Sequence, residues 1–205
     1  MLELFGKGLL LGFSIAAPVG PIGILCIRRT LAYGRVSGFV SGLGAATADA
    51  CYGAVAAFGL TAVSNWLLSF QSELTFIGGV FLCYLGWRLF FARASGQSAE
   101  AGRTGLISDY LSTVGLTITN PMTILSFAAV FAGMGLGNAG GDYASAAVLV
   151  LGVAIGSSLW WLTLSSAVHR LRERFSLDGI RWVNQLSGGI LFLFGLAAFF
   201  SFIQG

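Results

Sequence analysis

The chain has 205 residues, of which 56% are hydrophobic and only 9% are charged. A soluble domain carries about a quarter charged residues, so this composition excludes a globular protein that covers its surface with polar groups. The net charge of +3 does not indicate nucleic-acid binding, because the basic residues cluster between apolar stretches. These stretches are continuous, which favours membrane-spanning helices over the alternating strands of a membrane barrel.

Six apolar stretches have the roughly 20 residues that a helix needs to cross a bilayer. They are Phe5–Ile27, Val36–Thr61, Leu74–Phe91, Leu106–Gly133, Ala144–Val168 and Trp182–Phe202. The connections are short, and the longest polar one, Ala92–Arg103, is predicted to be a loop. We therefore predict an all-α membrane protein with six transmembrane helices in a single domain over residues 1–205.

Basic residues mark one side of the predicted helices. All eleven lysines and arginines except Lys7 fall near the end of the first, third or fifth stretch, or in the connection after it. The other connections contain Glu73 and Asp142 and no base. Loops rich in lysine and arginine face the cytoplasm in membrane proteins. The pattern therefore predicts a multi-pass protein with both termini outside the cytoplasm.

The two halves of the chain resemble each other weakly. Gly78-Gly79 in the third stretch and Gly188-Gly189 in the sixth are both followed by an apolar run that ends in Phe-Phe. The second and fifth stretches each carry glycines four residues apart, and proline interrupts the first and the fourth. Because three helices is an odd number, a second copy must enter the membrane inverted. We predict two inverted three-helix repeats, about residues 5–91 and 106–203, which is a transporter architecture; chance similarity between apolar helices is the alternative.

Asp49 lies in the middle of the second stretch. A carboxylate costs on the order of 2.5–3.5 kcal/mol at the centre of a membrane helix, so its presence there needs a reason. Small residues share its helical face, and they suit close contact with another helix: Gly38, Gly42, Ala45, Ala46, Gly53 and Ala56. We expect Asp49 to point into the bundle, either as a proton- or ion-coupling site or as a neutral carboxyl that is hydrogen-bonded to a neighbouring helix.

Two prolines interrupt the first stretch, Pro18 and Pro21, with Gly20 between them. In the fourth stretch, Pro121 follows Asn120. Proline removes a backbone donor and clashes with the carbonyl one turn back, so a continuous helix is not expected at either place. A break at membrane depth is tolerated where it faces protein or a polar cavity, and the free N–H groups that begin a half-helix attract an anion. We expect the two breaks to meet near the membrane midplane as a binding site, or to be kinks without a ligand.

Polar side chains of the fourth stretch allow two interpretations. Asn120 and Thr123 can bond to a substrate or hold a neighbouring helix. Asp109, near the start of the stretch, is interpreted as an interfacial residue.

Other chemistry finds little support in the sequence. The three cysteines form no CxxC pair and lie in or beside apolar stretches, as small buried side chains do. The one histidine, His169, lies among arginines in a predicted loop. Neither a phosphate-binding loop nor a serine–histidine arrangement is present, so we predict no metal site, no cofactor and no enzymatic activity.

Several motifs follow one another in order along nearly the whole chain. A proline- and glycine-rich first helix at Pro18–Pro21 precedes a glycine-rich second helix with Asp49 and Tyr52. The third stretch has Tyr84–Gly86 after Gly78, and the fourth has Asn-Pro. This ordered set resembles the LysE/RhtB family of bacterial amino-acid exporters.

The resemblance implies a secondary transporter in the bacterial plasma (inner) membrane that expels amino acids or closely related small metabolites by antiport with protons. The residues themselves lead to the hypothesis that Asp49 exchanges the proton and that a zwitterionic substrate binds at the helix breaks and their neighbours: Pro18, Gly20, Pro21, Tyr52, Asn120, Pro121 and Thr123. Many members have lysine after Asn-Pro where this chain has Met122, so the resemblance does not name the substrate. The expected partners are the substrate, protons and the lipid bilayer, and the small-residue faces permit a homodimer.

Other classes remain open. One alternative is a metal-cation exporter, because distant relatives of this fold handle cations. The sequence does not favour it, since it shows only one buried acid and no histidine or methionine cluster. A membrane electron carrier would use cysteines in the first and fourth helices, but Cys26 has no cysteine counterpart in the fourth, where Ser126 is the nearest small polar residue. A non-transporting scaffold or a membrane enzyme would leave the acid beside paired helix breaks unexplained.

Overall fold

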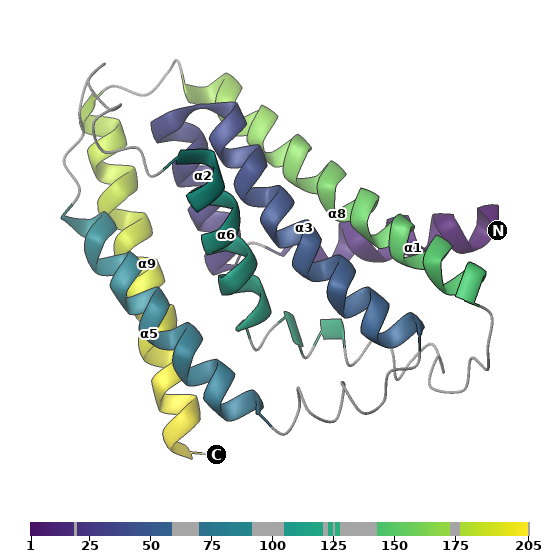
Figure 1. Ribbon diagram of the computed structural model, residues 1–205. Coiled ribbons are helices and arrows are strands. Elements are labelled where there is room, and N and C mark those ends of the chain that lie inside the picture. Colours follow the sequence, from purple (N-terminus) through teal and green to yellow (C-terminus); the bar gives the residue numbers. More distant parts are fainter. Residues whose placement is uncertain are drawn as a thin grey trace.

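The computed structural model describes residues 1–18, 20–58, 70–91, 105–120, 123–124, 126–127, 143–172 and 177–204. Its labelled helices (Figure 1) are α1 (Leu2–Ala16), α2 (Pro21–Tyr33), α3 (Arg35–Ala57), α5 (Gln71–Phe90), α6 (Gly105–Ile118), α8 (Tyr143–Arg172) and α9 (Leu177–Gln204). Within these ranges every regular element is an α-helix, which confirms the all-α prediction for the described residues. The predicted loop at Ala92–Arg103 lies outside them.

The distribution of polar and apolar side chains is the reverse of that in a soluble protein. Large apolar side chains such as Ile77 and Leu193 are more than half exposed, at 56% and 65%, whereas Ser41 and Ser157 are completely buried. Of the described helices, Tyr143–Leu171 and Arg181–Phe200 are each long and apolar enough to cross a membrane, and α1 with α2 adds a third if that bent pair is one span. These features are those of a helical membrane protein.

The first predicted helix is broken where its prolines lie. α1 ends at Ala16, α2 begins at Pro21, and the two axes are bent by 80°. Gly20 has an extended backbone (φ −104°, ψ −163°) and caps α2, whose first residue is Pro21. Proline is tolerated at that position because the first N–H groups of a helix have no acceptor within it. In the fourth stretch α6 ends at Ile118, just before the predicted break, and Pro121 itself lies outside the described residues.

The connection between α2 and α3 consists of Gly34 alone. Its φ of 97° falls in a region that strains residues with a side chain, so glycine makes this one-residue turn possible. α2 therefore extends past Ile27, the predicted end of the first stretch, and includes Arg28 and Arg29. The sequence pattern had placed both arginines in a connection, and that expectation is wrong.

The helices pack in a few extensive pairs. α1 lies along α8, α3 packs against both α6 and α8, and α5 lies along α9, as Figure 1 shows. The α5–α9 contact depends on glycine: a Cβ at Gly86 would lie 2.7 Å from the carbonyl oxygen of Gly188, and a Cβ at Gly188 would lie 2.7 Å from that of Gly86. Backbones can approach this closely only where neither residue has a side chain. The repeated Gly-Gly segments of the sequence both lie on this helix pair, where Gly188 faces Gly86 and Gly79 faces Gly195.

Candidate functional site

Asp49 lies on α3 at its contact with α8. Its side chain is 3% exposed, so the prediction that it points into the bundle is confirmed. The Ser157 hydroxyl of α8 donates a hydrogen bond of 2.7 Å to Asp49 Oδ2. Trp161 Nε1 donates in turn to Ser157 Oγ, at 3.2 Å. A buried acid is thus held by a hydroxyl that is itself oriented by an indole.

Trp161 reaches this position because α3 offers it space at Gly42. A Cβ at Gly42 would overlap the Cβ and ring of Trp161, so the indole packs directly on the α3 backbone. Trp161 is 4% exposed and belongs to the apolar core, which Ala45 and Ala46 of α3 also join. The small face of α3 therefore accommodates the largest side chain of α8 next to the acid.

Tyr52, one turn beyond Asp49 on α3, bonds to the end of α6. Its hydroxyl donates to the carbonyl oxygen of Ile118 at 2.6 Å, and its ring stacks on Phe127 with centroids 5.5 Å apart. The last carbonyls of a helix have no partner within the helix. Tyr52 therefore satisfies a backbone acceptor at the point where α6 stops.

The two helix breaks meet at a small pocket. It includes Pro21 from the start of α2 and Asn120 from the end of α6, and Thr75 and Gly78 of α5 also contribute. The remaining lining residues are Gly79, Leu82, Leu116, Thr119 and Ala198. Its volume of about 20 Å³ is enough for roughly one water molecule. Pro21 and Asn120, one residue from each predicted break, thus line the same pocket, and Pro121 lies outside the described residues.

Four other predicted binding residues, Pro18, Gly20, Tyr52 and Thr123, are not among the residues that line this pocket. Gly20 N–H donates to the Pro18 carbonyl oxygen at 3.0 Å, and the Pro18 side chain is exposed. Thr123 is buried, and its N–H donates to the Asn120 carbonyl oxygen at 3.1 Å. Asp49 is joined to α8 and is not among the residues that line the pocket.

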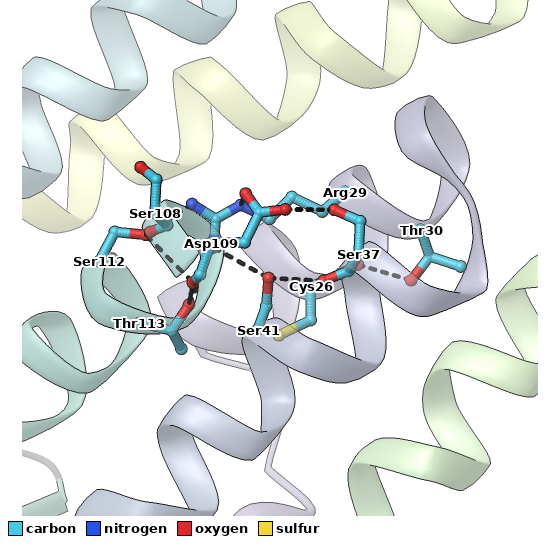
Figure 2. A network of polar contacts seen from close by, with 9 residues as sticks. All are labelled: Cys26, Arg29, Thr30, Ser37, Ser41, Ser108, Asp109, Ser112 and Thr113. Atoms are coloured by element: carbon cyan, nitrogen blue, oxygen red, sulfur yellow. Dashed lines mark hydrogen bonds and ion pairs between the residues drawn. The ribbon is translucent and has the colours of Figure 1, made fainter. Parts of the chain in front are cut away.

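A second buried polar cluster joins α2, α3 and α6 (Figure 2). Arg29 Nε lies 3.1 Å from Asp109 Oδ1, and the side chains are only 7% and 2% exposed. Ser37 Oγ donates to Asp109 Oδ2 at 2.6 Å. Arg29 Nη1 also donates to Ser41 Oγ, Thr113 Oγ1 and the Asp109 carbonyl oxygen, at 3.0, 2.9 and 2.9 Å, and Nη2 donates to Ser112 Oγ at 2.7 Å.

The sequence does not predict this cluster. The interpretation of Asp109 as an interfacial residue is wrong, because Asp109 forms a buried ion pair. Arg29 and Asp109 are distant in the chain, and no local spacing links them. The one available signal is the set of hydroxyl residues at helical spacing, Ser37 with Ser41 and Asp109 with Thr113, which marks a polar face on each helix.

Comparison with known proteins adds an independent observation. A family model described as LysE type translocator matches residues 13–201. The chain is similar to the "Uncharacterized membrane protein YahN" of Escherichia coli (strain K12), with 27% identity over 166 residues that cover 76% of this chain and 67% of that protein. It is similar to the "Putative amino acid efflux protein YcgF" of Bacillus subtilis (strain 168), with 24% identity over 200 residues that cover 95% of this chain and 94% of that protein. No solved structure matches the chain.

Proposed function

The chain belongs to the LysE type translocator family, and from this premise we propose that it is a secondary transporter that exports amino acids or closely related small metabolites. The family that the sequence motifs resemble is thereby confirmed. The name of the Bacillus subtilis relative, an amino acid efflux protein that aligns over nearly its whole length, supports the substrate class and the direction. The observation that carries the proposal is the buried Asp49, which bonds across the α3–α8 contact.

Proton exchange by Asp49 is the proposed source of energy. A carboxyl inside a helical membrane protein is expensive to retain and marks a proton or ion pathway by default. Its partner Ser157 is a hydroxyl, which can donate to a carboxylate and can rotate to accept from a carboxyl. Ser157 can therefore bond to Asp49 in both protonation states, which antiport with protons requires.

The substrate is proposed to bind where the two breaks meet. Free N–H groups at the start of α2 suit the carboxylate of a zwitterion, and Asn120 and Thr123 offer hydrogen bonds next to them. Tyr52 donates a hydrogen bond to the end of α6, just before Asn120. The pocket of about 20 Å³ is far smaller than an amino acid, so the helices that line it must separate to admit a substrate there.

The helix pairs support two inverted repeats, about residues 5–91 and 106–203. If the halves are equivalent, the contact of α1 with α8 corresponds to the contact of α6 with α3, and both are extensive. The remaining large contacts, α3 with α8 and α5 with α9, each join the equivalent helices of the two halves. This is the arrangement that a two-fold axis in the membrane plane would produce, and rocking of one repeat against the other would give alternating access.

The proposed membrane is the bacterial plasma membrane, with six spanning helices and both termini outside. The end of the bundle where α2 joins α3 then faces the cytoplasm. The small-residue faces also permit a homodimer.

Reconstitution of the purified protein in liposomes tests the proposal. A pH-sensitive dye inside the liposomes reports proton movement while each of the twenty amino acids is added in turn. We expect a signal for some amino acids with the wild-type protein and none with Asp49→Asn, which keeps the size of the side chain and a hydrogen-bond acceptor for Ser157. Cys51→Ala is the matched control, because Cys51 is an exposed neighbour on the same helix.

Two results would contradict the proposal. Normal proton movement with a folded Asp49→Asn protein would remove Asp49 from the coupling mechanism. Silence for all amino acids with folded wild-type protein would reject the substrate class, and the same liposomes would then be tested with divalent metal ions and other metabolites.

A further inference from the structure

Two consecutive arginines of α2 bond to the second half of the chain. Arg29 forms the ion pair with Asp109 on α6, and Arg28 Nε donates a hydrogen bond of 3.1 Å to Asn184 Oδ1 on α9. Both arginines are buried. Each contact therefore crosses from the first proposed repeat to the second.

Hydroxyl groups on both sides of this boundary complete the ion pair. Ser37 of the first repeat bonds to Asp109, and Arg29 bonds to Ser112 and Thr113 of the second. A hydroxyl can rotate and bond to water as readily as to a charged group. The cluster can therefore separate without leaving unpaired buried groups, provided that water enters as it opens.

The cluster is the main link between the two half-helices that flank the breaks. α2 follows the first break, α6 precedes the second, and the two helices make few contacts with each other apart from this one. Along α3, Asp49 lies roughly 12 Å further than Ser41, which bonds to Arg29. The arginines thus lie between Asp49 and the end of the bundle where Gly34 joins α2 to α3.

We propose that Arg28 and Arg29, with Asn184 and Asp109, form the gate that closes the transport pathway at this end of the bundle. The described conformation has the gate shut. The inference rests on the proposed rocking of two repeats, because the repeats can separate at this end only when both contacts break.

An ion pair suits such a gate for an electrostatic reason. When shut, the two charges of Arg29 and Asp109 are removed from water, and each needs the other as a partner. When water enters, both charges are hydrated and their mutual attraction becomes weak. Both charges therefore have partners in the closed state and in the hydrated open state. A half-open, dry state is high in free energy, because it leaves both charges without partners.

Cys26 supplies a native reporter of opening. It lies one turn before Thr30 on α2, beside the cluster (Figure 2), and is only 2% exposed. Replacement of the other cysteines, Cys51→Ala and Cys83→Ala, gives a single-cysteine parent. The parent in lipid nanodiscs, which expose both faces of the membrane, is treated with a water-soluble maleimide, and mass spectrometry follows the rate at which Cys26 is modified.

The expected result is a slow reaction in the parent and a reaction at least about tenfold faster in Asp109→Asn and in Arg29→Gln, because each leaves the opposite charge buried without its partner. The double variant Arg29→Gln/Asp109→Asn should react more slowly than either single variant, because it leaves no charge buried without a partner. Thr117→Val is the matched control, because this buried hydroxyl of α6 donates to Thr113 O of its own helix. Its rate should equal that of the parent.

Each variant is included only if size-exclusion chromatography shows folded, monodisperse protein. If Asp109→Asn does not fold, Ser112→Ala removes a single bond to Arg29 and should still raise the rate about two- to fivefold. Rates equal to the parent in both single variants, or a double variant that reacts faster than either single variant, would overturn the gate. The labelling result can be separated from the transport assay. If the variants label faster but the wild type gives no amino-acid signal in liposomes, the substrate class is rejected and the gate is kept. If the wild type gives a normal amino-acid signal but labelling is unchanged in the variants, the gate alone is rejected.

Discussion

Ser157 Oγ of α8 lies 2.7 Å from Asp49 Oδ2 of α3, and this hydrogen bond joins the two helices at a completely buried hydroxyl. Both residues lie on helices that occupy the same place in the two proposed repeats. One repeat therefore presents a carboxyl where the facing helix presents a hydroxyl. Of these two groups, only the Asp49 carboxyl can change its charge.

Ser157→Ala should weaken both the fold and transport. Without the hydroxyl, Asp49 loses its described partner, and an unsatisfied buried polar group costs about 1–3 kcal/mol. We expect a lower midpoint of thermal unfolding in detergent and a slower substrate-driven proton signal in liposomes. Ser158→Ala is the matched control, because that hydroxyl bonds to Ala154 O of its own helix. Equal effects of the two substitutions would show that the Asp49 contact has no special role.

Gly42→Ala should destabilise the contact between α3 and α8. The added methyl group would overlap Trp161, and overpacking of a buried contact costs about 1–3 kcal/mol. Gly189→Ala on α9 is the control, since a Cβ there meets nothing within 4 Å. Alanine is the better helix former by about 1 kcal/mol, so this control should not lose stability. Thermal unfolding of both variants measures the difference, and an unchanged midpoint for Gly42→Ala would show that Trp161 can move away freely.

Tyr52→Phe should impair transport more than its small chemical change suggests. It keeps the ring stacked on Phe127 but leaves the Ile118 carbonyl without its described donor, at a cost of about 1–2 kcal/mol. Because that carbonyl lies at the end of α6, the end of this helix should become less firmly held next to the predicted second break. We expect a raised KM for substrate, measured as the concentration dependence of the proton signal. Tyr84→Phe, at an exposed tyrosine of α5, should leave KM unchanged.

The sequence predicts those features of the fold that follow from local chemistry. The small face around Asp49 indicates which way the acid points, and Pro18 and Pro21 predict where the first helix breaks. By contrast, neither the burial of Arg29 nor its pairing with Asp109 follows from a local pattern. Arginines at the end of an apolar stretch look like topology signals. Only the one-residue turn at Gly34, which folds α2 back along α3, places Arg29 next to Ser37 and Ser41.

The stability of the Arg29–Asp109 pair should show the asymmetry that is typical of buried ion pairs. Asp109→Leu alone should lower stability by about 3–5 kcal/mol, because the arginine then remains buried without a counter-charge. Arg29→Met/Asp109→Leu, which removes both charges and fills their space with apolar atoms, should recover most of that loss. Thermal unfolding of the wild type and both variants in the same detergent gives the comparison. A double variant as unstable as Asp109→Leu would mean that the hydroxyls of Ser37 and Ser112, left without their charged partners, dominate the energetics of the cluster. A gate held by the pairing of the two charges predicts the opposite result, in which removal of both charges restores most of the stability that removal of one takes away.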